Sequence, residues 1–231
     1  MGWANEVEAA PNPTVRSGPV HAAVYWTVRD DGGARASWGS PWPRGEFNSA
    51  APTPPPMTAS SPVFRRPQVC ILGSAEPGSA AYELAGAAGE LLARCGVTVV
   101  SGCGSPATRV AAERALAAGG EVVSIVPSDD IGLKDWPCTV LIPCGMGDAR
   151  NLLMALAGDA CLVIGGRAGT ISEVCLAWLH HRPLLPLTGC GGWSDALPQN
   201  PPDERANSPI LPWDSIEALE AQLRSLGLLR T

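Results

Sequence analysis

Arg150 and Glu173 are the two charged residues whose setting in this chain indicates chemistry on an anionic ligand. Between them, residues 160–164 form a short apolar run, and the glycine-rich stretch 165–170 follows it directly. A strand that opens through a glycine turn into a helix directs backbone N–H groups and the positive end of the helix dipole toward an anion. An arginine suits the same ligand because its planar guanidinium donates hydrogen bonds in pairs. The pattern therefore predicts a site for a phosphate or a carboxylate.

Each of these two residues also has an ordinary structural interpretation. Glu173 stands in the first turn of a predicted helix, where an acidic residue complements the helix dipole. Arg150 can be a solvated helix residue, or it can pair with Asp148 or Asp159. The residue pattern by itself leaves both interpretations open.

The helix that carries Glu173 has a recognisable apolar spacing. Positions i, i+3, i+4 and i+7 are apolar, which is typical of the buried face of a helix. Thr170 and Glu173 are expected on a different face, three residues apart. The residues that we expect on the core face are Ile171, Val174, Cys175 and Trp178.

Short apolar runs alternate with helical patterns from residue 67 onward. Predicted strands cover residues 68–72, 97–100, 121–126, 139–142, 160–164 and 184–187, and predicted helices cover 79–95 and 106–118, begin near 150 and 170, and cover 215–226. Residues 189–212 are expected to form a loop. This alternation indicates an α/β fold, a single Rossmann-like domain with a mostly parallel sheet of about six strands and helices on both faces. Ligands of such sheets bind beyond the carboxyl ends of the strands, where four loops, at 73–74, 102–105, 145–150 and 165–170, are expected to converge.

The first 66 residues differ from the rest in composition and in hydrophobic pattern. Ten of the 23 prolines lie before Arg66, and no apolar period is sustained there. We expect residues 1–66 to be a disordered extension and residues 67–231 to form the folded domain. The run 24–28 is typical of a strand but has no obvious partner. An organelle transit segment, or a true start at Met57, would also explain the extension.

Composition restricts the partners. The formal net charge is −6 and no stripe of Lys and Arg is present, so we expect neither nucleic acid nor an anionic membrane as a partner. No apolar run approaches the roughly 20 residues of a membrane span. We expect a soluble, cytoplasmic protein.

The eight cysteines do not form a metal-binding pattern. None is arranged as C-x-x-C, and Cys70, Cys161 and Cys175 fall within apolar patterns, where cysteine acts as a small core residue. We expect reduced, buried thiols and no metal.

Three other enzyme classes lack their required residues. A decarboxylase that uses pyridoxal phosphate needs a Schiff-base lysine, and the one lysine, Lys134, lies in a predicted loop. No G-x-S-x-G elbow of a serine hydrolase occurs. The stretch 73–78 lacks the second glycine of a dinucleotide-binding G-x-G-x-x-G.

Two motifs, taken together, resemble those of the LOG-like superfamily of Rossmann proteins. Residues 145–151 read G-x-G-x-A-R-N, and residues 165–173 read G-G-x-x-G-T-x-x-E. That superfamily includes cytokinin-activating phosphoribohydrolases, proteins once described as lysine decarboxylase-like, and molybdenum cofactor carrier proteins. The resemblance extends over about residues 68–226, and the order of the motifs is most similar to the carrier branch.

The resemblance implies roles for the matching residues. In the phosphoribohydrolases the arginine and the glutamate form the catalytic pair, so Arg150 would position a ribose phosphate and Glu173 would act as acid and base. This chain departs from the hydrolase pattern at Arg167, which replaces a glycine, and at residues 105–109, which replace a glycine-rich stretch followed by Val-Met-Glu. Further ligand contacts are expected from Gly73, Ser74, Gly102, Gly104, Asn151, Gly165, Gly166, Arg167, Gly169 and Thr170.

Two functions follow as expectations. The first is a binding protein for a phosphorylated small molecule such as molybdenum cofactor, with no required cofactor of its own. The second is a hydrolase that cleaves the N-glycosidic bond of a nucleoside 5′-monophosphate such as AMP. The departures at Arg167 and at residues 105–109 favour the binding protein. A homodimer or homotetramer is expected from the resemblance.

Overall fold

The computed structural model describes residues 24–28, 34–38, 65–129 and 135–229. The chain divides into two units, Met1–Ser61 and Pro62–Thr231. In the first unit, β1 (Val24–Val28) pairs antiparallel with β2 (Ala34–Trp38). The expectation that the strand at 24–28 lacks a partner is therefore wrong. Most of the extension predicted to be disordered lies outside the described residues.

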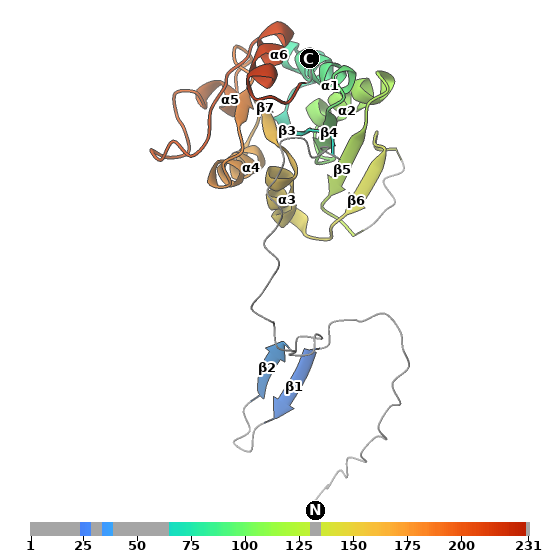
Figure 1. Ribbon diagram of the computed structural model, residues 1–231, viewed down its shortest axis with the longest axis vertical. Coiled ribbons are helices and arrows are strands. Elements are labelled where there is room, and N and C mark those ends of the chain that lie inside the picture. Colours follow the sequence, from blue (N-terminus) through green and yellow to red (C-terminus); the bar gives the residue numbers. More distant parts are fainter. Residues whose placement is uncertain (1–23, 29–33, 39–64, 130–134, 230–231) are drawn as a thin grey trace, which may run out of the picture. The chain divides into compact units, whose positions relative to one another are not determined.

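The second unit contains a six-stranded sheet in which every pairing is parallel (Figure 1). The strand order is β6-β5-β4-β3-β7-β8. The strands are β3 (Gln68–Ser74), β4 (Thr98–Ser101), β5 (Val122–Val126), β6 (Val140–Pro143), β7 (Ala160–Gly165) and β8 (Leu184–Pro186). The predicted Rossmann-like α/β fold is confirmed.

Helices cover both faces of this sheet. The helices are α1 (Ala80–Arg94), α2 (Pro106–Ala117), α3 (Arg150–Ala157), α4 (Ala168–Leu179), α5 (Trp193–Ala196) and α6 (Ile216–Ser225), and a short 3₁₀ turn, η1 (Gly147–Ala149), precedes α3. Helices α1, α2 and α6 lie on one side of the sheet, whereas α3 and α4 lie on the other (Figure 1). No helix in the described ranges is long and apolar enough to cross a membrane.

Serine side chains fix where three of the helices begin. Ser79, Ser105 and Ser215 each accept a hydrogen bond from the backbone N–H three residues further along. This bond satisfies one of the donors that a helix leaves unpaired at its first turn. The predicted helix starts near residues 79, 106 and 215 follow from these caps.

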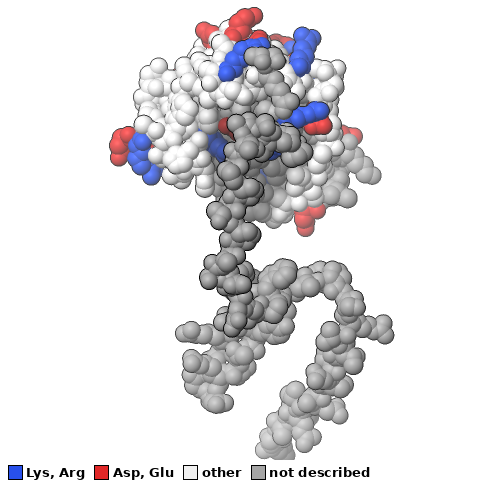
Figure 2. All heavy atoms as spheres, in the orientation of Figure 1, with Lys and Arg blue, Asp and Glu red and all other residues white. Residues whose placement is uncertain are grey.

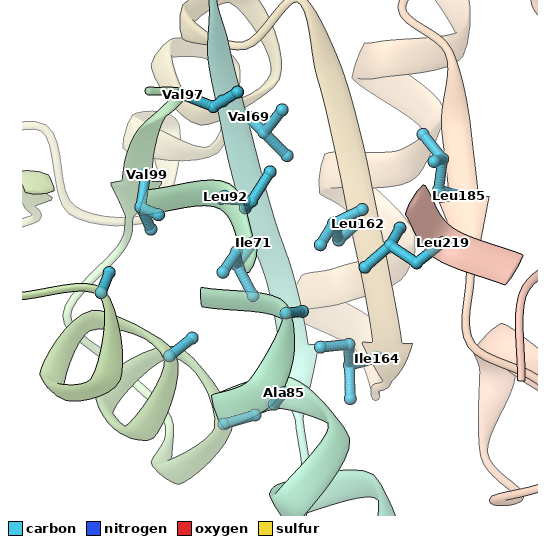
Figure 3. Close-up of a cluster of buried hydrophobic side chains, with 14 of the residues drawn as sticks. Val69, Ile71, Ala85, Leu92, Val97, Val99, Leu162, Ile164, Leu185 and Leu219 are labelled. Carbon is cyan, nitrogen blue, oxygen red and sulfur yellow. The ribbon is translucent and has the colours of Figure 1, made fainter. Parts of the chain in front are cut away.

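The central strands are buried on both faces, as expected for a parallel sheet covered by helices. Alternate residues of β3 and β7 project toward α1, where Ile71 and Leu162 pack near Leu92 (Figure 3). The residues between them, including Cys70 and Cys161, enter the core on the α3 and α4 side. Both thiols are fully buried, as predicted, whereas Cys175 is only half-buried.

The segment between β8 and α6 is more ordered than the predicted loop at 189–212. It contains the short helix α5, and parallel bridges join Leu184 to Ile210 and Leu187 to Trp213. The indole of Trp213 is buried and donates to the carbonyl of Leu185 at 2.8 Å. The glycines and prolines of this segment predict a loop, whereas contacts with β8 give it ordered structure.

Helices α1 and α2 approach each other closely because α1 carries a glycine at their interface. A Cβ at Gly89 would lie 2.1 Å from the carbonyl oxygen of Ala111 in α2. Backbone oxygen cannot move aside as a flexible side chain can, so the two helices would have to separate.

We predict that Gly89→Ala lowers the free energy of unfolding by about 1–3 kcal/mol, although alanine favours helix formation by about 1 kcal/mol over glycine. The measurement is urea unfolding followed by circular dichroism. Gly169→Ala is the matched control, because the same methyl group added to α4 meets no atom within 4 Å. Equal stability of the two variants would contradict the close approach of α1 and α2.

Candidate functional site

The order of the strands creates a switch point between β3 and β7. From β3 the chain adds β4, β5 and β6 on one side, and it then returns to place β7 and β8 on the other side. The loops after β3 and β7 therefore diverge and leave a crevice at the carboxyl edge of the sheet. A cavity of about 380 Å³ occupies this position. Its lining residues are Ile71, Gly73, Ser74, Glu76, Gly102, Gly104, Ser105, Pro106, Thr108, Asp148, Arg150, Asn151, Arg167, Gly169, Thr170 and Glu173.

The structure brings together ten of the twelve residues that the sequence analysis singled out. Arg150 and Glu173 line the same cavity, and the glycines that follow β3 and β4 line it as well. Gly165 and Gly166 do not line it. Six lining residues were not expected, namely Ile71, Glu76, Ser105, Pro106, Thr108 and Asp148.

Arg150 is the first residue of α3 and reaches across to the end of β4. Its Nη1 donates to the carbonyl oxygen of Gly102 at 2.7 Å. A Cβ at Gly102 would lie 1.8 Å from that Nη1, so the approach requires glycine at this position. The Nε of Arg150 is buried and has no hydrogen-bond partner in the described part of the chain. Arg150 forms no salt bridge with Asp148 or with Asp159. Asp159 pairs with Arg65 instead.

Glu173 is a buried carboxyl group, with 7% of its surface exposed. Burial raises its pKa from 4.5 to about 7, and the positive charge of Arg150 opposes this rise. Among the described residues, no group donates a hydrogen bond to the Glu173 carboxylate. A carboxyl group with a pKa near neutrality can exchange a proton at physiological pH.

The burial of Glu173 corrects the predicted orientation of α4. The buried positions of this helix are Thr170, Glu173, Val174, Ala177 and Trp178. Ile171 and Cys175, which were expected in the core, are only half-buried. The apolar spacing identified a helix correctly but placed its buried face too far from Glu173, because a polar residue that lines a cavity looks like a surface residue in the sequence.

The first turn of α4 presents free donors to the cavity. Arg167 occupies the N-cap position in an extended conformation and makes no capping hydrogen bond with its side chain. In the described residues no acceptor pairs with the backbone N–H of Ala168, Gly169 or Thr170. The serine-capped helices α1, α2 and α6 differ in this respect. The start of α4 therefore retains the donors that an anion would use.

Gly165 and Gly166 shape the turn that precedes α4. Their φ angles are +55° and +104°, values that side chains rarely adopt. The N–H of Gly165 donates to the hydroxyl of Ser194 in α5 at 2.9 Å, and that hydroxyl donates to the carbonyl of Leu187 at 2.8 Å. The Gly165 N–H is thus paired within the protein, and the expected contact of Gly165 with a ligand stays a prediction.

Asn151 connects α3 to the first turn of α4. Its Nδ2 donates to the Oγ of Ser172 at 2.7 Å, and this Oγ donates to the carbonyl of Gly169 at 2.7 Å. The Asn151 side chain is therefore engaged in holding the two helices together at the edge of the cavity.

Comparisons with known proteins agree with this fold. Residues 66–213 match the SLOG cluster4 family. An uncharacterised protein of Archaeoglobus fulgidus is 33% identical over 110 residues, which cover 48% of this chain and 72% of that protein. The chain therefore belongs to the SLOG cluster4 family.

Solved structures share the same fold. The X-ray structure of TM1055 has a TM-score of 0.63 at 24% identity and covers 69% of this chain and 99% of its own. The molybdenum cofactor carrier protein of Chlamydomonas reinhardtii has a TM-score of 0.59 at 22% identity, with coverages of 70% and 98%. DNA processing protein A of Helicobacter pylori, described for its single-stranded DNA binding, has a TM-score of 0.53 at 18% identity, with coverages of 71% and 82%.

We predict that Glu173→Gln removes a pH dependence of stability. Because folding raises the pKa of Glu173 from 4.5 to about 7, the folded state favours the protonated form, and stability is lost as the pH rises through this interval. The variant stays neutral throughout, so its free energy of unfolding should exceed that of the wild type by about 3 kcal/mol above pH 7 and match it below pH 4.5. Urea unfolding between pH 4 and pH 8 measures the difference.

Glu204→Gln serves as the control for this experiment because Glu204 is exposed. It should leave the pH profile of the wild type unchanged. If Glu173→Gln and the wild type show parallel profiles, the carboxyl group at position 173 is not held in a desolvated setting.

Proposed function

We propose that this SLOG cluster4 protein binds a phosphorylated small molecule at the carboxyl edge of its sheet, as a carrier-like binding protein related to the molybdenum cofactor carriers. The observation on which the proposal rests is the uncapped first turn of α4, which opens into a cavity that Arg150 and Arg167 also line. Three unpaired backbone N–H groups and two guanidinium groups are donors suited to phosphate oxygens.

Arg150 has donor capacity to spare for a ligand. Its Nη1 is engaged by Gly102, which fixes the position of the guanidinium, whereas its Nε is buried without a partner. An unpaired buried donor costs about 1–3 kcal/mol, and an anion that accepts from it would remove this cost. Arg167 is exposed at the start of α4 and has no salt bridge among the described residues.

The charge balance of the cavity limits what it can hold. Two arginines face three carboxyl groups, those of Glu76, Asp148 and Glu173. Glu76 and Asp148 are exposed, so solvent screens them, and the raised pKa of Glu173 leaves it partly neutral near pH 7. A monophosphate close to the start of α4 fits this balance better than a highly charged triphosphate. The volume of about 380 Å³ also lies in the range of small-molecule sites.

The carrier-like function is favoured over catalysis by the surroundings of Arg150 and Glu173. Arg167 stands where the resembling hydrolases have a glycine, and its side chain occupies space at the start of α4. Residues 105–109 replace the stretch that follows the second strand in those hydrolases. The fold is shared with the molybdenum cofactor carrier protein of Chlamydomonas reinhardtii, so molybdenum cofactor is the first ligand to test.

Hydrolysis of a nucleoside 5′-monophosphate is the second candidate, and the pKa of Glu173 favours it. A carboxyl group with a pKa of about 7 can give a proton to the leaving base or take one from water. In this reaction the C1′–N bond breaks, the hydroxyl group of water bonds to C1′, and the remaining proton of that water goes to the base nitrogen.

We predict that Arg150→Ala and Arg167→Ala each weaken the binding of ribose 5-phosphate by about 10- to 100-fold, the loss typical of a hydrogen bond to a charged group. Gly102→Ala should weaken binding to a similar extent, because its methyl group displaces the Arg150 guanidinium. Isothermal titration calorimetry measures the affinities.

Arg94→Ala is the control for charge removal, since Arg94 is exposed and pairs with Glu90 away from the cavity. It should bind ribose 5-phosphate as the wild type does. Unchanged affinity in all three site variants would refute the phosphate site at the start of α4.

We predict that the wild type binds AMP without releasing adenine. Reversed-phase chromatography of overnight reactions at pH 7 detects free base with high sensitivity. Adenine release that disappears in Glu173→Gln would replace the carrier proposal with the phosphoribohydrolase.

The same samples can be titrated with a labelled single-stranded oligonucleotide, for which we expect no binding. Arginine and acidic side chains are interspersed in small groups on the face in Figure 2, outside its grey atoms.

A further inference from the structure

The candidate site has different neighbours on its two sides. On the side of α1 and α2, a second cavity of about 410 Å³ adjoins it and shares Gly104, Ser105 and Pro106 with it. On the side of β8, residues 187–195 pack against the glycine turn that precedes α4. These residues, which we call the 187–195 segment, read L-T-G-C-G-G-W-S-D. All of them are described, and none of these described residues lines the cavity at the start of α4.

The glycine turn is intrinsically adaptable. Gly165 and Gly166 have φ angles of +55° and +104°, and glycine can adopt many other backbone conformations at little cost. Only Arg167 separates them from Ala168, the first residue of α4. The direction of the free N–H groups at the start of α4 therefore depends on contacts that fix the turn from outside.

Ser194 provides one such contact. Its side chain is fully buried, and its hydroxyl accepts from the Gly165 N–H at 2.9 Å and donates to the Leu187 carbonyl at 2.8 Å. A single hydroxyl thus joins the turn after β7 to the end of β8, the neighbouring strand. Without this hydroxyl a backbone donor and a buried backbone acceptor would both lose their partner, and the turn would be free to move.

Gly192 provides a second contact. A Cβ at this position would lie 2.9 Å from the Cα of Gly165 and 3.1 Å from its carbonyl carbon. The 187–195 segment therefore approaches the turn at backbone-to-backbone distance, which leaves the turn no room to shift toward it. The end of β3 limits the turn as well, because a Cβ at Gly165 would lie 2.5 Å from the carbonyl oxygen of Ser74.

Asp195 keeps the 187–195 segment in shape. Its Oδ1 accepts from the N–H of Gly189 at 2.7 Å, and its Oδ2 accepts from the N–H of Gly191 at 2.9 Å. Hydrogen bonds to a charged group of this kind are roughly twice as strong as neutral ones. The φ angles of Gly189, Gly191 and Gly192 are +79°, +73° and +79°, values that few other residues adopt. Asp195 therefore fixes a loop that glycine alone would leave adaptable.

From these contacts we propose that Ser194 and Gly192 are positioning residues for the anion site, and that the 187–195 segment sets the affinity of this site without touching the ligand. The segment holds the glycine turn, and the turn directs the backbone N–H groups of residues 168–170 toward the phosphate. The inference rests on the proposed function, because it assumes a phosphate at the start of α4. Binding groups have to be held within about 0.5 Å of their productive positions, which a glycine turn needs external support to achieve.

The test combines nuclear magnetic resonance with calorimetry on the full chain. Backbone amide spectra of the free protein report the setting of residues 168–170, and isothermal titration with ribose 5-phosphate reports the affinity. Ser194→Ala removes the hydroxyl that holds the turn. Leu197→Ala is its control, because Leu197 is fully buried in the core beside α3 and α4, and its variant loses packing without removing a bond to the turn.

A second pair of variants tests the same claim by adding atoms. Gly192→Ala places a methyl group against the turn and leaves the Ser194 hydroxyl in place. Gly189→Ala is its control, because Gly189 has the same φ of +79° and a Cβ there meets no atom within 4 Å. This pair keeps the inference testable if Ser194→Ala does not fold, and dispersed amide spectra show which variants are folded.

We expect Ser194→Ala and Gly192→Ala to shift the amide signals of residues 168–170 before any ligand is added. Both should weaken the binding of ribose 5-phosphate by about 10-fold or more, since a misplacement of about 1 Å can cost about 100-fold in a catalytic site. Leu197→Ala should lower the midpoint of thermal unfolding and leave these amide signals and the affinity as in the wild type. Gly189→Ala should also retain the affinity of the wild type.

The other outcomes separate this inference from the function on which it rests. If the wild type binds ribose 5-phosphate and the folded variants at positions 194 and 192 bind it equally tightly, the positioning role is wrong and the anion site stands. An equal loss of affinity in Leu197→Ala would mean that general destabilisation decides the affinity, and it would also overturn the inference. Absence of binding by the wild type overturns the proposed function, and the positioning role with it.

Discussion

The pairing of β3 with β7 is the constraint on which the site depends. These two strands are far apart in the sequence, yet they align over six residue pairs, from Val69 and Ala160 to Ser74 and Gly165. The pairing brings the turn after β3 beside the turn after β7, which creates the crevice. It also sets the spacing, because a Cβ at Gly73 would lie 2.0 Å from the carbonyl oxygen of Ile164. Glycine at the end of β3 is thus required by the sheet itself, in addition to any role in binding.

A second constraint is the balance between a fixed arginine and a buried carboxyl group. Arg150 donates to the Gly102 carbonyl and not to Glu173, so its charge acts on Glu173 only through space. If the two formed a close ion pair, Glu173 would be ionised at neutral pH and the guanidinium would have less capacity for a ligand. The observed arrangement leaves the carboxyl group near its titration point and keeps a donor of the arginine unpaired. Arrival of a phosphate would add negative charge to the cavity and raise the pKa of Glu173 further.

The sequence predicted the elements well, because local signals control where they begin. Continuous apolar runs identified the strands. Three helices begin close to their predicted starts because Ser79, Ser105 and Ser215 cap them with hydrogen bonds confined to one turn. The two motifs also predicted correctly that Arg150 and Glu173 line one space. Their catalytic or binding roles stay predictions, since only ligand measurements test them.

Features that arise from distant contacts could not be predicted from the sequence. The buried face of α4 was misplaced because Glu173 is buried against a cavity, and periodicity treats every charged residue as exposed. Helix α5 was missed because its Ser194 is positioned by Gly165 and Leu187, which belong to other elements. Trp136 gave no signal, since a single aromatic residue in a loop has no spacing to interpret. The cavity that it lines is completed by Arg109 and Tyr82, which lie 27 and 54 positions earlier in the chain.

The two adjoining cavities are built by different parts of the fold. The strand–turn–helix at α4 supplies backbone donors, and any phosphate can use them whatever is attached to it. The wall of the neighbouring cavity is built by α1, the start of α2 and the segment that carries Trp136. These parts lie outside the paired central strands, so they can change without disturbing the sheet. A chain that replaces this wall would therefore keep the sheet and the start of α4 unchanged.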